Sequence, residues 1–343
     1  MTPISLRNFG GGERWLITIG NEFVKRGIEV EIYALSYLPT GEQRISFPKL
    51  EKMINFQYRE LEYRIGKMSP LRMKKIPSLV NTDLIYIMGA YYYFLKQCLK
   101  LNSPKVYGFH DPALQSPKNL LQKRIVKNLF PKFSLIHLLN KWQLKMIPSN
   151  SNHFLLENTW FGELPKIQEK FEKFTVLFFG RHEESKGLKT LEYVAMNFPD
   201  DSVLNIAGSG SVPLNLLHPK NNVNFLGFLD DNELYYNISR SHAVLFPSFS
   251  EASSIVAIES ISHSTPVIYR NIPQNFLLER SDLCLKCTSD EEFLTGVIKL
   301  GSSYEENPQE YLNRCKGLPS ILMSKDDYFN TLISSMVSIM ATK

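Results

Sequence analysis

Residues 246–259 read Phe-Pro-Ser-Phe-Ser-Glu-Ala-Ser-Ser-Ile-Val-Ala-Ile-Glu, and this stretch decides which fold we expect. The apolar run 243–246 is typical of a buried strand, and the polar loop after it contains Glu251. The apolar residues that follow recur with a helical period, so a helix is predicted to begin near Ser253 or Ser254. Serine suits a helix N-terminus, where free N–H groups and the positive end of the helix dipole bind phosphate without a metal ion. The stretch therefore predicts a strand, an anion-binding loop and a helix in succession.

A second stretch, residues 179–187, reads Phe-Gly-Arg-His-Glu-Glu-Ser-Lys-Gly and also lies between a predicted strand and a predicted helix. This position places Arg181 and Lys186 at the carboxyl edge of a parallel sheet. Arg offers a bidentate fork and Lys a point charge, and both suit a diphosphate that no metal neutralises. In a third stretch, residues 205–211, a strand runs into a Gly-Ser-Gly turn that begins at Gly208. Alone this turn is a weak signal, because glycine also serves a tight turn.

The first stretch contains two carboxylates, Glu251 and Glu259. Glu259 follows Glu251 by eight residues, which corresponds to roughly 10–12 Å along a helix that rises about 1.5 Å per residue. This distance is close to the separation of the ribose and the hexose in a nucleotide sugar, and carboxylates accept hydrogen bonds from vicinal hydroxyls. The alternative interpretation is two surface glutamates on one helix.

Short apolar runs alternate with amphipathic, helix-length segments along almost the whole chain, which is typical of strand–helix–strand units and parallel sheets. A chain of 343 residues fits two domains of about 150 residues each. A polar stretch near residue 165 separates them. We expect one doubly wound domain over residues 1–165, a second over residues 166–320, and a final helix within residues 321–343 that could pack back on the first. Strands are predicted at residues 28–34, 84–88, 105–109, 134–139, 153–156, 175–179, 203–207, 223–226, 243–246, 266–269 and 283–286.

The first domain adds two candidate features. Gly10, Gly11 and Gly12 stand before the first predicted helix, where backbone amides can approach a phosphate closely. Only residues 4–6 are available for a strand before this turn, so that strand is unusually short. A later strand ends in His110, and a histidine at such a place is either a site residue or a turn residue.

In this order and at these distances, the motifs resemble those of glycosyltransferase family 4, whose members have the GT-B fold of two Rossmann-like domains facing a central cleft. The resemblance is dense in the second half of the chain and looser in the first. It implies a retaining transfer of a hexose-type sugar from a nucleoside diphosphate sugar to a lipid-linked or glycan acceptor, with the acceptor on the first domain. It implies no metal ion and no cofactor, and the chain contains no Asp-x-Asp motif.

The resemblance also implies a role for each candidate residue. It places His110 and Glu251 in catalysis beside the transferring sugar, and Glu259 together with Glu251 at the sugar and ribose. The implied diphosphate-binding residues are Arg181, Lys186, Ser253, Ser254, Ile255, Gly10, Gly11 and Gly12. The implied base-binding residues are Phe228, Leu229 and Gly208.

The sequence departs from the family pattern directly after Glu251, where Ala252, Ser253 and Ser254 replace the usual Gly-Phe-Gly. Side chains there restrict the approach of the backbone to a phosphate. Two alternatives therefore stay open: a catalytically inactive GT-B scaffold or binding subunit, and a nucleotide-sugar epimerase on the same fold. The charged candidate residues are intact, which favours the active transferase.

Charge is unevenly distributed along the chain. The first 170 residues carry 25 Lys and Arg against 13 Asp and Glu, whereas the whole chain has a net charge of only +5, so the remainder is acidic. Residues 118–132 predict a basic amphipathic helix, which would suit peripheral contact with an anionic membrane. A solvated helix face is the alternative. Nucleic acid is not an expected partner, because the basic half lacks stacking-aromatic or groove-reading motifs.

Nothing in the sequence predicts secretion or a membrane span. The longest apolar run without a charge, residues 84–95, has 12 residues, and a spanning helix needs about 20. The four cysteines suggest reduced thiols, and the single pair Cys284-x-x-Cys287 lacks the further ligands that zinc needs. We therefore expect a cytoplasmic protein, either free or at the inner face of the cell membrane.

Overall fold

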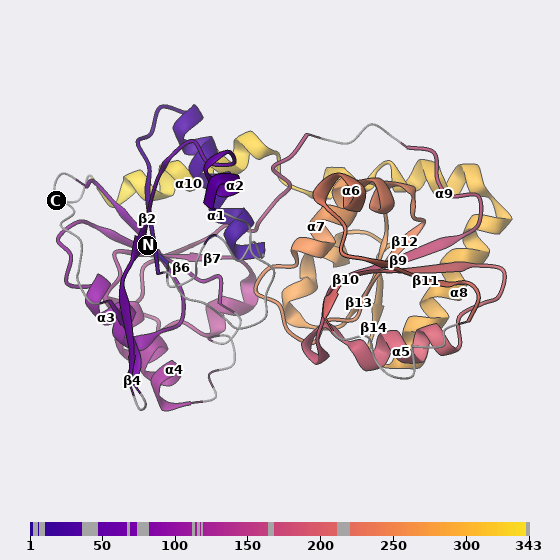
Figure 1. Ribbon diagram of the computed structural model, residues 1–343, viewed down its shortest axis with the longest axis horizontal. Coiled ribbons are helices and arrows are strands. Elements are labelled where there is room, and N and C mark those ends of the chain that lie inside the picture. The colour runs from indigo at the N-terminus through magenta and orange to yellow at the C-terminus, as the bar shows by residue number, and fades with distance from the viewer. Residues whose placement is uncertain are drawn as a thin grey trace. The chain divides into compact units, whose positions relative to one another are not determined.

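The computed structural model describes residues 1–2, 6, 11–35, 47–66, 69–73, 82–111, 114, 117, 119–163, 168–210 and 220–340. The chain forms two compact units (Figure 1). The first unit holds Met1–Glu157 together with Phe329–Lys343, and the second holds Asn158–Tyr328. The chain therefore passes between the units twice.

The residues at the two crossing points contact each other within the second unit. The Tyr328 hydroxyl donates a hydrogen bond to Asn158 Oδ1 (3.4 Å), and the Tyr328 ring packs edge-on against Phe161 (4.9 Å between centroids). Trp160 packs against His263 (5.3 Å). These contacts attach the segment after the first crossing to the second unit, so the structural division comes before the polar stretch near residue 165.

The second unit contains a six-stranded sheet in the order β11-β10-β9-β12-β13-β14, and every neighbouring pair is parallel. The order reverses between β9 and β12, so the switch point of a doubly wound sheet lies there. The strands are β9 (Thr175–His182), β10 (Val203–Gly210), β11 (Val223–Gly227), β12 (Ala243–Phe246), β13 (Val267–Arg270) and β14 (Leu285–Cys287). The α-helices are α5 (Leu188–Met196), α6 (Asp231–Arg240), α7 (Ile255–Ser262), α8 (Asp290–Glu306) and α9 (Pro308–Cys315).

Both faces of the central strand β9 are buried. Val176 and Phe178 belong to a core shared with α5 and α8. Leu177 and Phe179 belong to the core on the other face, which includes α6. A strand covered on both faces is apolar at every position, and that continuity is what makes it recognisable in the sequence.

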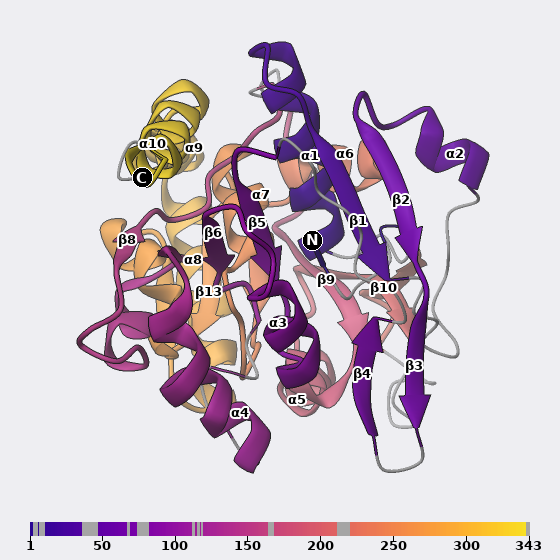
Figure 2. The same cartoon turned by 90° about the vertical axis from the view of Figure 1, so that its left-hand side faces the viewer.

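The first unit contains a four-stranded parallel sheet β5-β6-β7-β8, a parallel pair β1-β2 and an antiparallel hairpin β3-β4 (Figure 2). Thr2 forms a parallel bridge with Ala34 of β1, and the Met88 amide of β5 donates to the Met1 carbonyl (3.0 Å). Of the predicted opening strand, residues 4–5 lie outside the described residues. The strands are β1 (Glu31–Leu35), β2 (Gln57–Leu61), β3 (Tyr63–Gly66), β4 (Ser69–Met73), β5 (Ile85–Met88), β6 (Lys105–Gly108), β7 (Leu135–Leu138) and β8 (His153–Leu155).

The last helix of the chain reaches the first unit. Within α10 (Lys325–Ser338), Phe329 packs edge-on against Phe23 of α1 (6.0 Å between centroids). The Arg26 guanidinium lies 5.1 Å from the centroid of the Phe329 ring. The other α-helices of this unit are α1 (Gly11–Lys25), α2 (Phe47–Glu51), α3 (Tyr92–Cys98) and α4 (Leu120–Arg124).

The predicted basic helix is not one continuous α-helix. It begins with α4, whose start is closed by a capping box between Asn119 and Gln122. It continues as a π-helical turn, Ile125–Leu129, and then as a 3-10 turn, Phe130–Lys132. Pro131 accounts for this end, because proline has no N–H to donate and disfavours the α conformation in the residue before it. The two faces are as expected: Lys123, Arg124 and Lys127 are exposed, while Ile125, Leu129 and Phe130 are buried.

Candidate functional site

Two loops meet at the switch point of the second sheet, one after β9 and one after β12. The Phe249 amide of the second loop donates to the Ser185 carbonyl of the first (2.9 Å). Gly187 lies against Pro247 so closely that a Cβ on Gly187 would be 2.4 Å from the Pro247 carbonyl oxygen. Gly187 also has a φ of +80°, so both space and backbone conformation require glycine there. The two motifs that the sequence separates by some 60 residues are therefore joined through their backbones.

This junction brings Lys186 and Glu251 into direct contact. Lys186 Nζ lies 2.6 Å from Glu251 Oε1, and the Ser248 hydroxyl donates to the same oxygen (2.6 Å). The Lys186 and Glu251 side chains are 23% and 12% exposed, so the ion pair is partly withdrawn from water but still reachable. A cation and a carboxylate are thus held together before any ligand is bound.

The second predicted cation has a different partner. Arg181 is the next-to-last residue of β9, and its Nη1 lies 2.8 Å from Glu183 Oε1. Both side chains are about half exposed. Arg181 therefore lies at the end of β9 and Lys186 on the loop that follows it, and each is paired with its own carboxylate.

Helix α7 begins where the sequence predicts, although its first serine does not act as a cap. Ser254 occupies the N-cap position, yet its hydroxyl makes no capping hydrogen bond and instead donates to Asn275 Oδ1. Ser253 precedes it, and Ile255 is the first helical residue. Glu259, in the middle of α7, is only 3% exposed. The structure therefore orients Ser254 into the protein and encloses Glu259.

The loop that carries Glu251 is supported by Arg270, the last residue of β13. Arg270 is 7% exposed, and its Nε donates to the Pro247 carbonyl (2.9 Å). Its guanidinium carbon lies 3.9 Å from the centroid of the Phe249 ring, and its Nη2 donates to the Thr190 hydroxyl. One buried cation therefore fixes both the start of the loop and the ring within it. Arg270 was not among the residues predicted from the sequence, although a cation that ends an otherwise apolar strand was a visible signal.

The predicted base-binding residues lie farther along the same sheet edge. Gly208 in β10 has a φ of +140°, and a Cβ there would be 1.8 Å from the Gly180 carbonyl oxygen, so the two neighbouring strands come together only through glycine. Phe228 and Leu229 follow the edge strand β11; Phe228 is 60% exposed and Leu229 is half-buried. The exposed Phe228 ring is a flat apolar surface at this edge.

In the first unit, His110 lies two residues after the end of β6, next to side chains of the two neighbouring strands. The Tyr86 hydroxyl lies 3.0 Å from His110 Nε2 and 2.7 Å from His137 Nδ1. The opposite nitrogen of His137 lies 2.9 Å from the Leu156 carbonyl oxygen. Burial, and secondarily the neighbouring His137, hold the pKa of His110 well below its usual range, and burial lowers the pKa of His137 to about 4. Both rings are therefore neutral near pH 7.

The predicted glycine turn leads to the same cluster. Gly10 lies outside the described residues, while Gly11 and Gly12 form the first turn of α1. Four residues after Gly11, Trp15 is 4% exposed, and its ring packs against His110 (4.2 Å between centroids). Trp15, Tyr86 and His137 were not among the site residues predicted from the sequence. A histidine inside the apolar run of β7 was the available signal.

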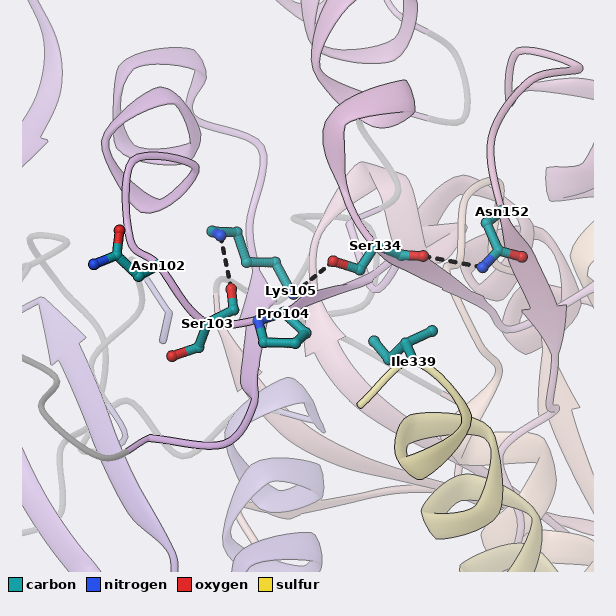
Figure 3. Close-up of a pocket in the computed structure, with 7 residues that line it drawn as sticks. All are labelled: Asn102, Ser103, Pro104, Lys105, Ser134, Asn152 and Ile339. Atoms are coloured by element: carbon teal, nitrogen blue, oxygen red, sulfur yellow. Dashed lines mark hydrogen bonds between the residues drawn. The ribbon is translucent and has the colours of Figure 1, made fainter. Parts of the chain in front are cut away.

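A pocket of about 380 Å³ in the first unit lies away from these residues (Figure 3). It is at the start of β6, the opposite end of the strand from His110. Its polar groups bind one another: Lys105 Nζ donates to the Ser103 carbonyl (2.7 Å), and Asn152 Nδ2 to the Ser134 carbonyl (3.0 Å). This pocket contains none of the predicted site residues.

Within the residues that the structure describes, no group of three or more histidine, cysteine, aspartate or glutamate side chains is arranged to hold a metal ion. None of the described helices combines the length and the apolar character that crossing a membrane requires. The cysteines are buried and unpaired as disulfides, and burial raises the pKa of the Cys284 and Cys287 thiols to about 12.

Two α/β units with parallel sheets, and candidate residues at the carboxyl ends of their strands, define the GT-B class of proteins. Comparison with protein families assigns both halves: residues 162–316 match the family described as glycosyl transferases group 1, and residues 9–145 match glycosyltransferase family 4. The protein belongs to these glycosyltransferases.

Solved structures agree with this class. HepE from Anabaena in complex with UDP and glucose has a TM-score of 0.74, with 16% identity over 98% of each chain. A glycosyltransferase from Rickettsia africae has a TM-score of 0.72, with 12% identity over 100% of this chain and 98% of that one. Sucrose-phosphate synthase from Thermosynechococcus elongatus has a TM-score of 0.68, with 15% identity over 95% and 94%. At these identities the likeness shows the fold. No curated protein matches the chain in sequence.

Proposed function

We propose that this glycosyltransferase is a retaining, metal-independent enzyme that transfers a hexose-type sugar from a UDP-linked donor to a lipid-linked or glycan acceptor. The observation that carries the proposal is the contact between Lys186 and Glu251 at the switch point of the second sheet. Doubly wound sheets bind ligands at this point. A uridine nucleotide is supported by HepE, whose structures contain UDP with glucose and UDP-glucose.

In this proposal the two cations at the end of β9 and on the loop after it, Arg181 and Lys186, bind the donor diphosphate. The departing nucleoside diphosphate carries two or three negative charges, which charge-assisted hydrogen bonds stabilise most strongly in a partly enclosed site. Lys186 is the more enclosed of the two, and Arg181 is the more accessible, because more than half of its side chain is exposed. Glu251, which already holds Lys186, accepts hydrogen bonds from sugar hydroxyls.

The reaction that we propose needs no nucleophile from the protein. The bond between the anomeric carbon and the phosphate oxygen breaks, and the acceptor oxygen bonds to the same face of that carbon. The departing phosphate oxygen takes the proton that the acceptor hydroxyl loses. The protein contributes by positioning the reactants and stabilising the phosphate charge.

The acceptor is assigned to the first unit, and a lipid-linked acceptor at an anionic inner membrane face fits its basic segment. Lys123, Arg124 and Lys127 are exposed there, next to Leu120, which is 62% exposed. Cations beside an exposed apolar residue suit the surface of an anionic membrane. In vesicle flotation, we expect binding only with anionic lipid, and its loss when the three cations are changed to Gln. Binding that is independent of lipid charge would contradict contact through these cations, and no binding to vesicles would favour a soluble glycan acceptor.

Donor binding is tested by calorimetry with UDP-glucose, GDP-glucose and ADP-glucose in the presence of EDTA. We expect UDP-glucose to bind with a Kd on the order of micromolar, and Lys186→Met to weaken it about tenfold or more. Lys189→Met is the matched control, because Lys189 is an exposed cation three residues later. Its Kd should equal that of the wild type.

Measurements on the same samples distinguish the transferase from an inactive scaffold and from an epimerase. A folded protein that binds no donor would favour the inactive scaffold, for which the replacement of Gly-Phe-Gly by Ala252, Ser253 and Ser254 is the argument. Conversion of the donor sugar without an acceptor would favour the epimerase. An inverted anomeric centre in the product, measured by NMR, would contradict the retaining mechanism.

A further inference from the structure

We propose that Tyr86 and His137 are positioning residues that hold His110 in its Nε2–H tautomer, so that His110 presents Nδ1 as a hydrogen-bond acceptor to a hydroxyl of the transferring sugar. This inference rests on the proposed function and on the role, implied by the family resemblance, of His110 beside that sugar. The contacts that carry it are the hydrogen bonds from Tyr86 to both imidazole rings.

The direction of each hydrogen bond in the cluster follows from its partners. A backbone carbonyl only accepts, so His137 Nε2 carries the proton that is donated to the Leu156 oxygen (2.9 Å). In the neutral ring Nδ1 then has a lone pair, and the Tyr86 hydroxyl must donate to it (2.7 Å). That hydroxyl has only one proton, so the contact with His110 Nε2 (3.0 Å) requires His110 to be the donor. His110 Nδ1 is therefore left as an acceptor.

His137 stays neutral near pH 7. Its ring is fully buried, and burial lowers its pKa to about 4. A protonated His137 would instead donate from Nδ1, and the Tyr86 hydroxyl would then turn to His110 and reverse the tautomer. Near neutral pH only the first arrangement is available.

Aromatic side chains pack on the imidazole rings of His110 and His137 and hold them in place. Trp15, itself 4% exposed, packs on the His110 ring (4.2 Å between centroids), and Phe154 stacks on the His137 ring (4.7 Å, 11° between planes). A Cβ at Gly108 would be 2.3 Å from the Tyr86 hydroxyl oxygen, so the absence of a side chain at Gly108 provides the space for this hydroxyl. The Tyr86 hydroxyl therefore fits between the imidazole rings of His110 and His137.

The lone pair of His110 Nδ1 is available to a ligand. His110 has no other side-chain hydrogen bond among the described residues, so its Nδ1 lone pair is not used within that part of the chain. A sugar hydroxyl has a proton to donate, whereas a fluorine or hydrogen in its place has none. We therefore expect His110 to distinguish a hydroxyl from these substitutes.

The first measurement is the tautomer of His110 in the wild-type protein, read from its two ring nitrogens by NMR of ¹⁵N-histidine-labelled enzyme without substrate. We expect a protonated Nε2 and an unprotonated Nδ1 near pH 7. A protonated Nδ1 would overturn the inference. This measurement needs neither activity nor a variant, so it is independent of the proposed function.

The second measurement uses Tyr86→Phe, which removes only the hydroxyl. We expect a mixture of His110 tautomers and a fall in kcat/KM of about tenfold, as for the loss of one well-placed hydrogen bond. Tyr107→Phe is the matched control, because Tyr107 is a fully buried tyrosine of β6 whose hydroxyl donates to the Gly89 carbonyl (3.0 Å). Its tautomer signal and kcat/KM should stay close to those of the wild type.

The third measurement tests whether the effect of Tyr86→Phe depends on one particular hydroxyl of the donor sugar. Donors with each hexose hydroxyl replaced in turn by hydrogen are compared in wild type and in Tyr86→Phe. One replacement should cost about tenfold in kcat/KM in the wild type and clearly less in the variant. Equal costs in both proteins, or an unchanged tautomer in Tyr86→Phe, would overturn the inference. Absence of transfer by the wild type, with the expected tautomer present, would instead contradict the proposed function.

Discussion

Lys186 Nζ and Glu251 Oε1 lie 2.6 Å apart, so the cation assigned to the donor phosphate is neutralised by the carboxylate assigned to the donor sugar. The two residues come from loops on adjacent strands of the second sheet, and a backbone hydrogen bond between Phe249 and Ser185 holds those loops together. Binding of a diphosphate therefore competes with an existing ion pair.

Glu251→Gln should separate binding of the nucleotide from transfer of the sugar. Without the carboxylate charge, Lys186 is freer to meet phosphate, so UDP alone should bind about two- to fivefold more tightly, in keeping with the modest strength of a partly exposed ion pair. Transfer should be slower, because a carboxylate is lost beside the sugar. Calorimetry with UDP and steady-state kinetics check the two effects. The control is Glu184→Gln, at an exposed position of the loop that carries Lys186; weaker UDP binding by Glu251→Gln would contradict the competition.

Arg270→Lys should loosen the loop that carries Glu251. Lysine has no planar fork, so it cannot donate to the Pro247 carbonyl and the Thr190 hydroxyl while lying flat on a ring. We expect the free energy of unfolding to fall by about 1–3 kcal/mol and the donor Kd to rise.

Urea unfolding and calorimetry measure the two effects of Arg270→Lys. The exposed Arg280, which stacks on Phe276 (5.6 Å), provides the control, and Arg280→Lys should change stability by less than about 0.5 kcal/mol. Equal losses of stability and equal changes in donor Kd for the two substitutions would contradict the role of Arg270 in supporting the loop that carries Glu251.

Gly187→Ala and Gly227→Ala should separate backbone strain from a steric clash. Both glycines have positive φ angles, +80° and +68°, but only Gly187 has an atom in the way, the Pro247 carbonyl oxygen. We expect Gly227→Ala to cost about 1–2 kcal/mol of stability and Gly187→Ala at least about 1 kcal/mol more. Urea unfolding measures both, and a similar cost for both would mean that the two loops are not in close contact.

His137 should make the protein less stable in acid. Its pKa is lowered from 6.5 in the unfolded chain to about 4 in the folded protein, so between those values the unfolded chain binds a proton that the folded protein does not. The free energy of unfolding therefore falls as the pH falls from about 6.5 to 4, by about 1.4 kcal/mol per pH unit for this group. Unfolding at a series of pH values should show a slope that is shallower by that amount in His137→Gln; identical slopes would contradict it. His110 adds to the wild-type slope in the same direction.

The strands of the second unit were predictable because they are buried on both faces. Residues 176–179 and 243–246 read as continuous apolar runs. Apart from the short opening strand at residues 4–6, of which 4–5 lie outside the described residues, each predicted strand is present, with its ends shifted by at most a few residues. Strand β2 was not predicted, because Gln57–Leu61 is largely polar and none of its side chains is fully buried. A strand at the edge of a sheet carries less of the pattern on which sequence interpretation depends.

The candidate site was predictable only in part, because sequence places a residue at a sheet edge but does not say which side chain it contacts. Lys186 and Glu251 were both expected at that edge, yet their direct contact depends on how two loops pack. Tyr86 and His137 are unremarkable members of two strands, and only the register of β5, β6 and β7 brings them to His110. Ser254 was expected at a helix start, and its hydroxyl is taken by a neighbour 21 residues away.

The contact between Tyr328 and Asn158 means that the second unit begins and ends at one place in the fold. In topological terms this unit is an insertion: one uninterrupted segment supplies all six strands of its sheet. The first unit is the host, and it is assembled from two separate pieces of chain. A truncation at the C-terminus therefore removes part of the unit that the N-terminal half of the chain builds. It leaves the inserted unit whole.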